Sequence, residues 1–282
     1  MICFYHSVDL DGQCSGALVK LFHPECKMYG INYGDEFPWD EVKKHYDGIF
    51  IVDFSLQPFE NMVKLQNKYK VIWIDHHESA IKAHERWNQE HKEPLIIDGI
   101  RQIGIGACKL VWNYLNKEDH TPTFVQLLAE YDVWDHSNPM TLPFQYGMRL
   151  FDTDPGNVDF WRSLFDVEMV NKIVENGSMI LKYEQTQNQK YIESCGFEIE
   201  FEGLKCICVN KMLTNSKIFD SVKNSSKYDV MLTFGWKSNK WIVSLYTSKN
   251  DIDVSKIAVK YGGGGHKGAA GFLCDELPFK LK

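Results

Sequence analysis

Short apolar runs alternate with helical patterns through the first third of the chain. Five runs rich in β-branched and aromatic residues are predicted to be strands, at residues 2–7, 27–33, 49–55, 71–77 and 95–99. The segments between them have helical spacing or composition, at residues 14–22, 58–69 and 81–90. Because alternation of strands and helices favours parallel pairing, we predict an α/β domain whose parallel sheet carries helices on both faces.

The pattern becomes mostly helical after Gly99 and changes again near Gly196. Apolar residues recur at spacings of three and four in three segments, at residues 107–116, 123–134 and 168–191. Alternating segments beyond Gly196 predict strands, followed by one helix, a run of glycines and a short apolar strand. We therefore predict an N-terminal domain at 1–165, a helical linker at 166–195 and a smaller α+β domain at 196–282.

Acidic and imidazole side chains follow three of the predicted strands. They are His6, Asp9 and Asp11 after the first strand, Asp53 after the third, and Asp75, His76 and His77 after the fourth. In an open parallel sheet, ligands bind beyond the carboxyl ends of the strands, so these side chains are expected to converge on one edge. Crowded carboxylates repel each other unless cations lie between them. The pattern predicts a two-metal site for manganese, or less selectively for iron, cobalt or zinc.

Each piece of this set also has a simpler structural interpretation. Asp11 alone is well explained as the cap of the helix that begins near Gly12. Asp53 alone fits a cap of the helix after its strand, and the Asp–His–His run fits a polar strand end bonded to its own loop. Each residue taken alone can be explained by its structural interpretation. The presence of such residues at three strand ends of one sheet, however, favours a joint metal site.

Charge and cysteine content limit the class of partner. The chain has 282 residues, is 44% hydrophobic and carries a formal net charge of -7, which argues against coating long duplex nucleic acid. Bound cations can still attract a short anionic substrate. The eight cysteines form no CxxC pair, so Cys206 and Cys208 are expected to be small buried residues in a reducing compartment. The start resembles no signal peptide and no stretch is long enough to span a bilayer, which predicts a cytoplasmic protein without membrane contact.

Five motifs together resemble a known family. HSVDLDG, IVDFS, IDHH and EYDVWDH follow the order and approximate spacing of the four motifs of the DHH phosphoesterase superfamily. GGGGHKGAAGF resembles the glycine-rich motif of its DHH-associated C-terminal domain. RecJ-type exonucleases, nanoRNases, pAp phosphatases and dinucleotide phosphodiesterases share this plan. The resemblance implies a Rossmann-like DHH domain followed by a DHH-associated substrate-binding domain.

The resemblance also assigns roles to individual residues. It implies two bound Mn²⁺ ions, with Mg²⁺, Co²⁺ or Fe²⁺ as alternatives. The metal ligands would be His6, Asp9 and Asp53 for one ion, and Asp11, Asp53, His76 and Asp132 for the other. Asp75 would orient its neighbours and His77 would face the substrate phosphate. The family pattern selects Asp132 over Asp135 and His136, which are expected at a solvated helix end. Only two residues separate His6 from Asp9, whereas many members of the family have three. This variant of the motif is similar to that of the nanoRNase B branch.

The glycine run is the main candidate for substrate binding in the second domain. The amides of Gly263, Gly264 and Gly265 are expected to hold a phosphate, with His266 and Lys267 adding hydrogen bonds or charge. The alternative is a glycine-terminated helix and an ordinary turn. Tyr246 occupies a strand position where relatives often carry a phosphate-binding arginine. It is expected either to contact the substrate or to be an ordinary strand tyrosine, with Lys249 or Lys267 compensating.

These observations predict a manganese-dependent phosphoesterase, an exonuclease-like hydrolase. Its substrates are predicted to be nucleotide phosphate esters or short oligoribonucleotides. An exopolyphosphatase or pyrophosphatase is the alternative within the same chemistry, and a catalytically silent nucleotide sensor is the alternative of another class. The choice of RNA or DNA, the direction of digestion and the oligomeric state stay open, a dimer being one option.

Overall fold

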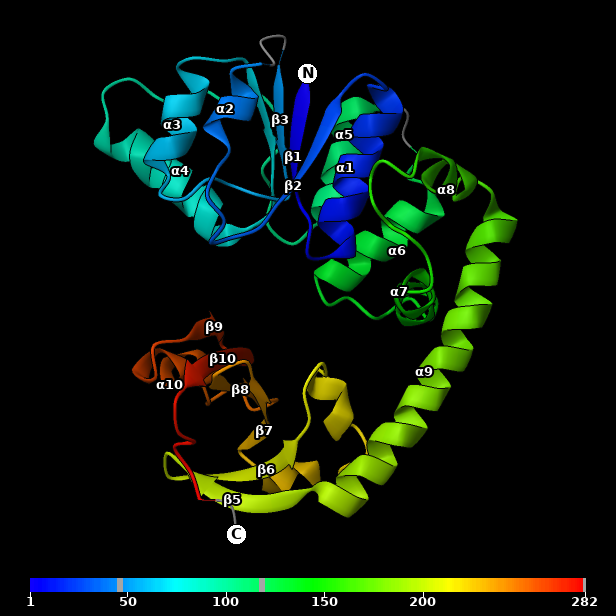
Figure 1. Cartoon of the computed structure of the whole chain (residues 1–282), viewed down its shortest axis with the longest axis vertical. Coiled ribbons are helices and arrows are strands. Elements are labelled where there is room, and N and C mark those ends of the chain that lie inside the picture. The colour runs from blue at the N-terminus through cyan, green and yellow to red at the C-terminus, as the bar shows by residue number, and fades with distance from the viewer. Residues whose placement is uncertain (45–47, 117–119, 281–282) are drawn as a thin grey trace. The chain divides into compact units, whose positions relative to one another are not determined.

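The computed structural model describes residues 1–44, 48–116 and 120–280. The chain divides into two compact units, Met1–Leu181 and Lys182–Lys282. The long helix α9 (Val167–Cys195) begins in the first unit and ends in the second (Figure 1). Among the described helices, none combines the length and the apolar character needed to cross a membrane.

The first unit contains a parallel sheet in which the described strands follow the order β2-β1-β3-β4. These strands are β1 (Ile2–His6), β2 (Lys27–Ile31), β3 (Ile49–Val52) and β4 (Val71–Ile74). The fifth predicted strand, at residues 95–99, is not a regular strand and contributes one isolated parallel bridge, between Asp98 and Ile72 of β4. Gly99 interrupts it, because its φ of 115° breaks the extended conformation and its Cα approaches the Trp73 carbonyl.

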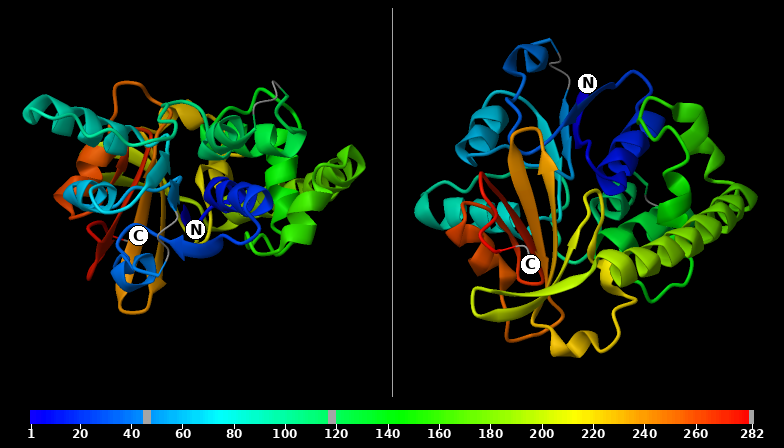
Figure 2. Two further views of the ribbon diagram at one scale, coloured as in Figure 1. Left: turned by 90° about the horizontal axis from the view of Figure 1, so that it is seen from above. Right: turned by 60° about the horizontal axis from the view of Figure 1, so that its bottom comes forward.

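Helices cover both faces of this sheet, as predicted (Figures 1 and 2). One face packs against α1 (Leu10–Phe22), α5 (Ala107–Leu115) and α6 (Thr123–Asp132). The other face packs against α2 (Trp39–Val42), α3 (Glu60–Gln66) and α4 (Glu78–Glu90). Alternation along β1 explains the division, since Cys3 points to the first layer and Ile2 and Phe4 point to the second.

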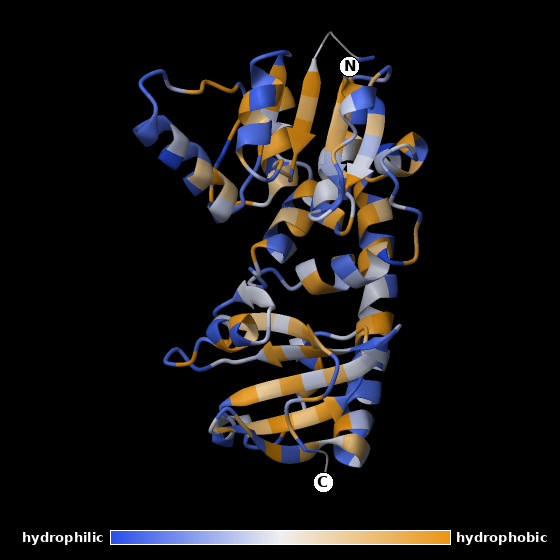
Figure 3. Cartoon of the chain, turned by 60° about the vertical axis from the view of Figure 1, so that its left-hand side comes forward, coloured by the Kyte–Doolittle hydropathy of each residue, from blue (hydrophilic) through white to orange (hydrophobic). Residues whose placement is uncertain are grey.

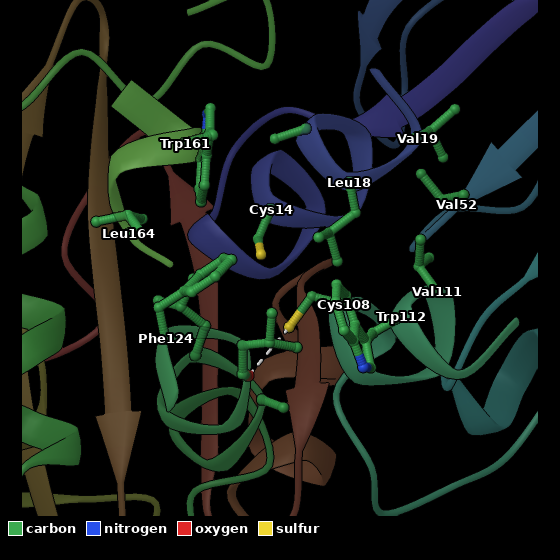
Figure 4. Close-up of a cluster of buried hydrophobic side chains, with 14 of the residues drawn as sticks. Cys14, Leu18, Val19, Val52, Cys108, Val111, Trp112, Phe124, Trp161 and Leu164 are labelled. Carbon is green, nitrogen blue, oxygen red and sulfur yellow. Dashed lines mark hydrogen bonds between the residues drawn. The ribbon is translucent and has the colours of Figure 1, made fainter. Parts of the chain in front are cut away.

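Figure 4 shows the first of these layers, where Cys14 and Leu18 of α1 pack against Cys108 and Val111 of α5. Two further short helices, α7 (Thr141–Met148) and α8 (Val158–Ser163), complete this layer. They are absent from the sequence prediction because six to eight residues give too few turns for a clear period.

The strand order places a crevice at the carboxyl ends of β1 and β3. The chain leaves β1 to build β2 on one side and then crosses to build β3 on the other. This reversal is the topological switch point at which open α/β sheets bind ligands. His6 ends β1 and Asp53 follows β3, so the residues singled out in the sequence lie at this position.

The second unit has a mixed sheet with the strand order β5-β6-β7-β8-β10-β9 among its described residues. Its strands are β5 (Phe197–Phe201), β6 (Leu204–Asn210), β7 (Val230–Lys237), β8 (Lys240–Tyr246), β9 (Gly264–His266) and β10 (Ala269–Cys274). Helix α10 (Val254–Lys260) and the 3₁₀ turns η1 (Ser216–Phe219) and η2 (Ser225–Lys227) accompany the sheet. Figure 3 shows the hydrophobic stretches of the strands in both units. Cys206 and Cys208 are buried in the core beneath α10.

The glycine run forms strand β9, where the sequence pattern indicated no strand. Gly263 and Gly265 approach the backbone of β10 so closely that a Cβ there would lie 2.1 Å from the Gly271 carbonyl and 2.5 Å from the Ala270 Cα, respectively. Gly264, in contrast, would meet no atom within 4 Å. Two of the glycines are therefore required by close strand pairing.

Candidate metal centre

Two aspartates of the first motif serve as caps of different helices. Asp9 is the N-cap of α1, and its Oδ1 accepts the Gly12 N–H at 2.9 Å. Asp11 instead accepts the Ala107 and Cys108 N–H groups at 2.6 and 2.9 Å, at the start of α5. The interpretation of Asp11 as the cap of its own helix is therefore wrong, because Asp9 takes that role. The partial positive charge at the start of α5 favours a carboxylate here.

Asp53 lies at the centre of the site. Its carboxylate is 1% exposed, with Oδ2 3.6 Å from His6 Nδ1 and Oδ1 3.3 Å from His76 Nε2. It caps no helix, since α3 begins at Glu60. Its φ of 53° lies in the left-handed region, which is strained for a residue other than glycine and is often found at functional sites.

The predicted ligands form three overlapping groups, two of which contain Asp53. His6 Nδ1 lies 3.0 Å from Asp9 Oδ2. His76 Nε2 lies 3.1 Å from Asp132 Oδ2 and 3.9 Å from Asp11 Oδ2. The ligand atoms within each group lie within 4.8 Å of one another, the groups being His6, Asp9 and Asp53; Asp11, His76 and Asp132; and Asp53, His76 and His77.

Asp75 fixes the loop that carries both histidines. It is fully buried, and its Oδ1 accepts the backbone N–H groups of His76 and His77 at 2.8 and 3.0 Å. His77 Nδ1 lies 2.7 Å from the same oxygen, and the Trp73 indole N–H donates to Oδ2 at 3.2 Å. With Nδ1–H donated to Asp75, the Nε2 atom of His77 is left for a ligand.

The electrostatics show that the site needs positive charge. Burial raises the pKa of Asp132 to about 7, and nearby Asp11 adds to the shift. Burial and Asp53 likewise raise the pKa of Asp11 to about 7. Burial opposes a charged imidazole at His76, but Asp53, Asp11 and Asp132 outweigh it and raise the pKa of His76 to about 10. Protons thus take the place of cations among these carboxylates.

Divalent cations fit this site. Asp53 Oδ1 and His6 Nδ1 are buried without a hydrogen-bond partner, and each lies within 4 Å of another candidate ligand atom. Carboxylate oxygens combined with imidazole nitrogens suit first-row divalent metals. The two carboxylate oxygens of Asp53 lie near different histidines, Oδ2 near His6 and Oδ1 near His76.

Tyr33 is a site residue that sequence reasoning missed. Its ring centroid lies 5.6 Å from that of His6 and 5.7 Å from that of His77, with each pair edge-on. The available signal was an aromatic residue at the end of the second predicted strand. Asp135 and His136 belong to none of the ligand groups formed by described residues, and His136 stacks on Tyr131.

Four of the predicted substrate residues of the second unit lie on strands β8 and β9, while Lys267 lies in the turn after β9. Tyr246 of β8 and His266 of β9 both pair with Ala269 of β10, which lies between them. His266 and Lys267 are exposed, and Tyr246 is half-buried. Lys249 is held by Asp229 at 2.6 Å.

Comparison with known proteins agrees with these observations. The DHHA1 domain model matches residues 211–277. The chain is 27% identical to the oligoribonuclease NrnB of Bacillus subtilis, and the aligned region covers the whole of this chain and 75% of NrnB. It is also 27% identical to the uncharacterized protein R106 of Acanthamoeba polyphaga mimivirus, over 96% of this chain and 66% of R106, just under two thirds.

The fold has a counterpart among solved structures. The pGpG-specific phosphodiesterase PggH of Vibrio cholerae superposes with a TM-score of 0.53 at 13% identity, over 96% of this chain and 92% of PggH. The parallel sheet, the ordered motifs at its strand ends and the DHHA1 match all agree with one assignment. The chain is thus similar to members of the DHH phosphoesterase superfamily, and its residues 211–277 match the DHHA1 domain.

Proposed function

We propose that this protein is a divalent-metal-dependent phosphodiesterase that hydrolyses short oligoribonucleotides or dinucleotides. The observation that carries the proposal is the meeting of two ligand groups at Asp53. The similarity to NrnB, an oligoribonuclease, supports the substrate class. The eight cysteines are all free thiols, which supports action in a reducing compartment such as the cytoplasm.

The metal ligands in this proposal form two sets that share Asp53. They are His6, Asp9 and Asp53 for one ion, and Asp11, Asp53, His76 and Asp132 for the other. We propose manganese as the metal, since mixed carboxylate and imidazole ligands suit it. Two such ions supply charge neutralisation at the phosphoryl oxygens and a water of lowered pKa.

The protein's own groups position the substrate. Burial opposes charge on His77, but Asp75 outweighs it and raises the pKa of His77, so the imidazole favours the protonated form. A protonated His77 donates a hydrogen bond from Nε2 to a phosphoryl oxygen, which becomes more favourable as negative charge develops there. In the second unit, Gly264, Gly265, His266, Lys267 and Tyr246 are proposed to be substrate-binding residues.

Product analysis by chromatography tests the function. Protein with manganese is incubated with a 5′-phosphorylated RNA dinucleotide, pAp, a longer RNA, pyrophosphate and polyphosphate. We expect mononucleotide release from the short RNA, lost in Asp53→Ala protein and in chelator. Orthophosphate from the inorganic substrates alone would overturn the proposal in favour of an exopolyphosphatase. Nucleotide binding without any product would favour a sensor.

A further inference from the structure

A cavity of about 370 Å³ opens at the carboxyl ends of β2 and β3 in the first unit. This volume lies within the range typical of small-molecule sites. Tyr33 forms the wall that the cavity shares with the candidate metal centre, because its ring also meets His6 and His77 edge-on. A ligand in the cavity would therefore lie one aromatic ring away from the metal ligands.

The apolar walls of the cavity are aromatic. Tyr33 packs on the buried ring of Phe54 at 4.9 Å, and Phe37 meets Trp39 at 5.0 Å. The ammonium group of Lys64 lies 4.1 Å from the Trp39 ring and helps to fix it. Aromatic side chains of this kind bind unpaired nucleobases by stacking.

The polar walls accept hydrogen bonds from a ligand and repel phosphate. Asp35 and Glu36 are exposed in the cavity wall, and none of its described lining residues is a lysine or arginine. Asp35 Oδ2 accepts the Asn32 N–H at 2.9 Å, and the Asn32 side chain accepts the Ser7 hydroxyl at 3.0 Å. These bonds hold the Asp35 carboxylate in place before a ligand arrives.

We propose that this cavity is a nucleobase subsite that favours guanine and holds the base of the nucleotide whose phosphate is cleaved. The proposal rests on the proposed function and specifies its substrate. A planar base can stack on the aromatic wall, and the carboxylates exclude a second phosphate. Guanine presents two adjacent N–H donors on one edge, a match for one carboxylate, whereas adenine presents only an amino group there.

Ligand binding measured by NMR titration tests the subsite without catalysis. The full-length protein in chelator is titrated with GMP, AMP and ribose 5-phosphate. We expect GMP to bind about tenfold more tightly than ribose 5-phosphate, from stacking on one face. Tyr33→Leu should abolish that advantage and Tyr33→Phe should restore it. Equal binding of GMP and ribose 5-phosphate, or an unchanged advantage in Tyr33→Leu, would overturn the subsite.

The guanine preference has its own variants. Asp35→Asn keeps an acceptor for the Asn32 N–H but loses the charge, so the preference for GMP over AMP should fall to near unity. Asp159→Asn is the matched control, since Asp159 is 98% exposed on α8. An equal affinity of the wild type for GMP and AMP would overturn the preference.

Turnover of GpG with manganese separates this proposal from the proposed function. The Michaelis constant for GpG should rise about tenfold in Tyr33→Leu, while that for an abasic analogue should not change. If the wild-type protein binds GMP through Tyr33 but hydrolyses no substrate, the subsite is supported and the proposed function is overturned. If GpG and the abasic analogue are hydrolysed equally fast, the proposed function is supported and the subsite is overturned.

Discussion

Replacing Asp132 by asparagine should stabilise the metal-free protein although it removes a proposed metal ligand. Burial and Asp11 raise the pKa of Asp132 from 3.8 to about 7 in the folded state. Between about pH 4 and 7 the folded protein therefore keeps a proton that the unfolded chain has lost. Its stability must fall as the pH rises through this window, and the loss is complete above the folded pKa.

The size of the effect follows from the shift. One pKa unit is worth about 1.4 kcal/mol, so the full shift corresponds to about 4 kcal/mol, of which about 3 kcal/mol falls between pH 5 and pH 8. The side chain is 23% exposed, so solvent screens the charge only in part. Asparagine has nearly the same shape as aspartate but cannot ionise, so Asp132→Asn protein does not lose this stability as the pH rises.

Denaturant unfolding in chelator at about pH 5 and pH 8 measures this difference. We expect Asp132→Asn to gain about 3 kcal/mol on the wild type between the two pH values. Asp159→Asn, exposed on α8, should gain less than about 0.5 kcal/mol. Manganese should then stabilise the wild type more than Asp132→Asn. If the difference in unfolding free energy between the wild type and Asp132→Asn is the same at both pH values, the reasoning is refuted.

Two further predictions concern the loop of β4 and the glycine strand. Asp75→Asn keeps one acceptor oxygen but loses the negative charge beside His77 Nδ1 and the second oxygen, which accepts the Trp73 indole N–H. We therefore expect kcat to fall about 10- to 100-fold, with calorimetry showing whether metal binding is retained. Gly263→Ala would place a Cβ 2.1 Å from a backbone oxygen of β10 and should lower stability by about 2 kcal/mol or more in thermal unfolding. Gly264→Ala meets no atom within 4 Å, so it should keep the melting temperature and raise the Michaelis constant; a matching loss of stability would count against a substrate role for Gly264.

The sequence was most informative where a buried strand ends in an ionisable residue. His6 and Asp53 follow apolar runs whose residues are almost all buried, so the ends of β1 and β3 could be located from composition. The same logic failed at residues 95–99, because apolar composition does not reveal that Gly99 adopts a left-handed φ against the Trp73 backbone. Strand β9 was missed for the opposite reason, since glycines have no side chains to alternate.

Asp132 marks the limit of reasoning from local pattern. It ends α6 and reaches His76 only because α6 packs with α1 and α5 beneath the sheet, a tertiary arrangement that no window of sequence contains. Only the family resemblance selected Asp132 over Asp135, because the composition of the local sequence does not distinguish a carboxylate at one position from one at the other.

Asp11 shows why the metal centre and the fold are hard to separate. Its two oxygens hold the first N–H groups of α5, which lies almost a hundred residues later in the chain, and one of them also faces His76. A buried carboxylate with fixed donors keeps its position without a metal, so the core orients this ligand before any ion binds. The fixed backbone donors of α5 also offset part of the repulsion from Asp53 that a cation would otherwise have to neutralise alone. The centre is therefore preorganised by the packing of α1 against α5, and substitutions in that interface should weaken metal binding without touching a ligand.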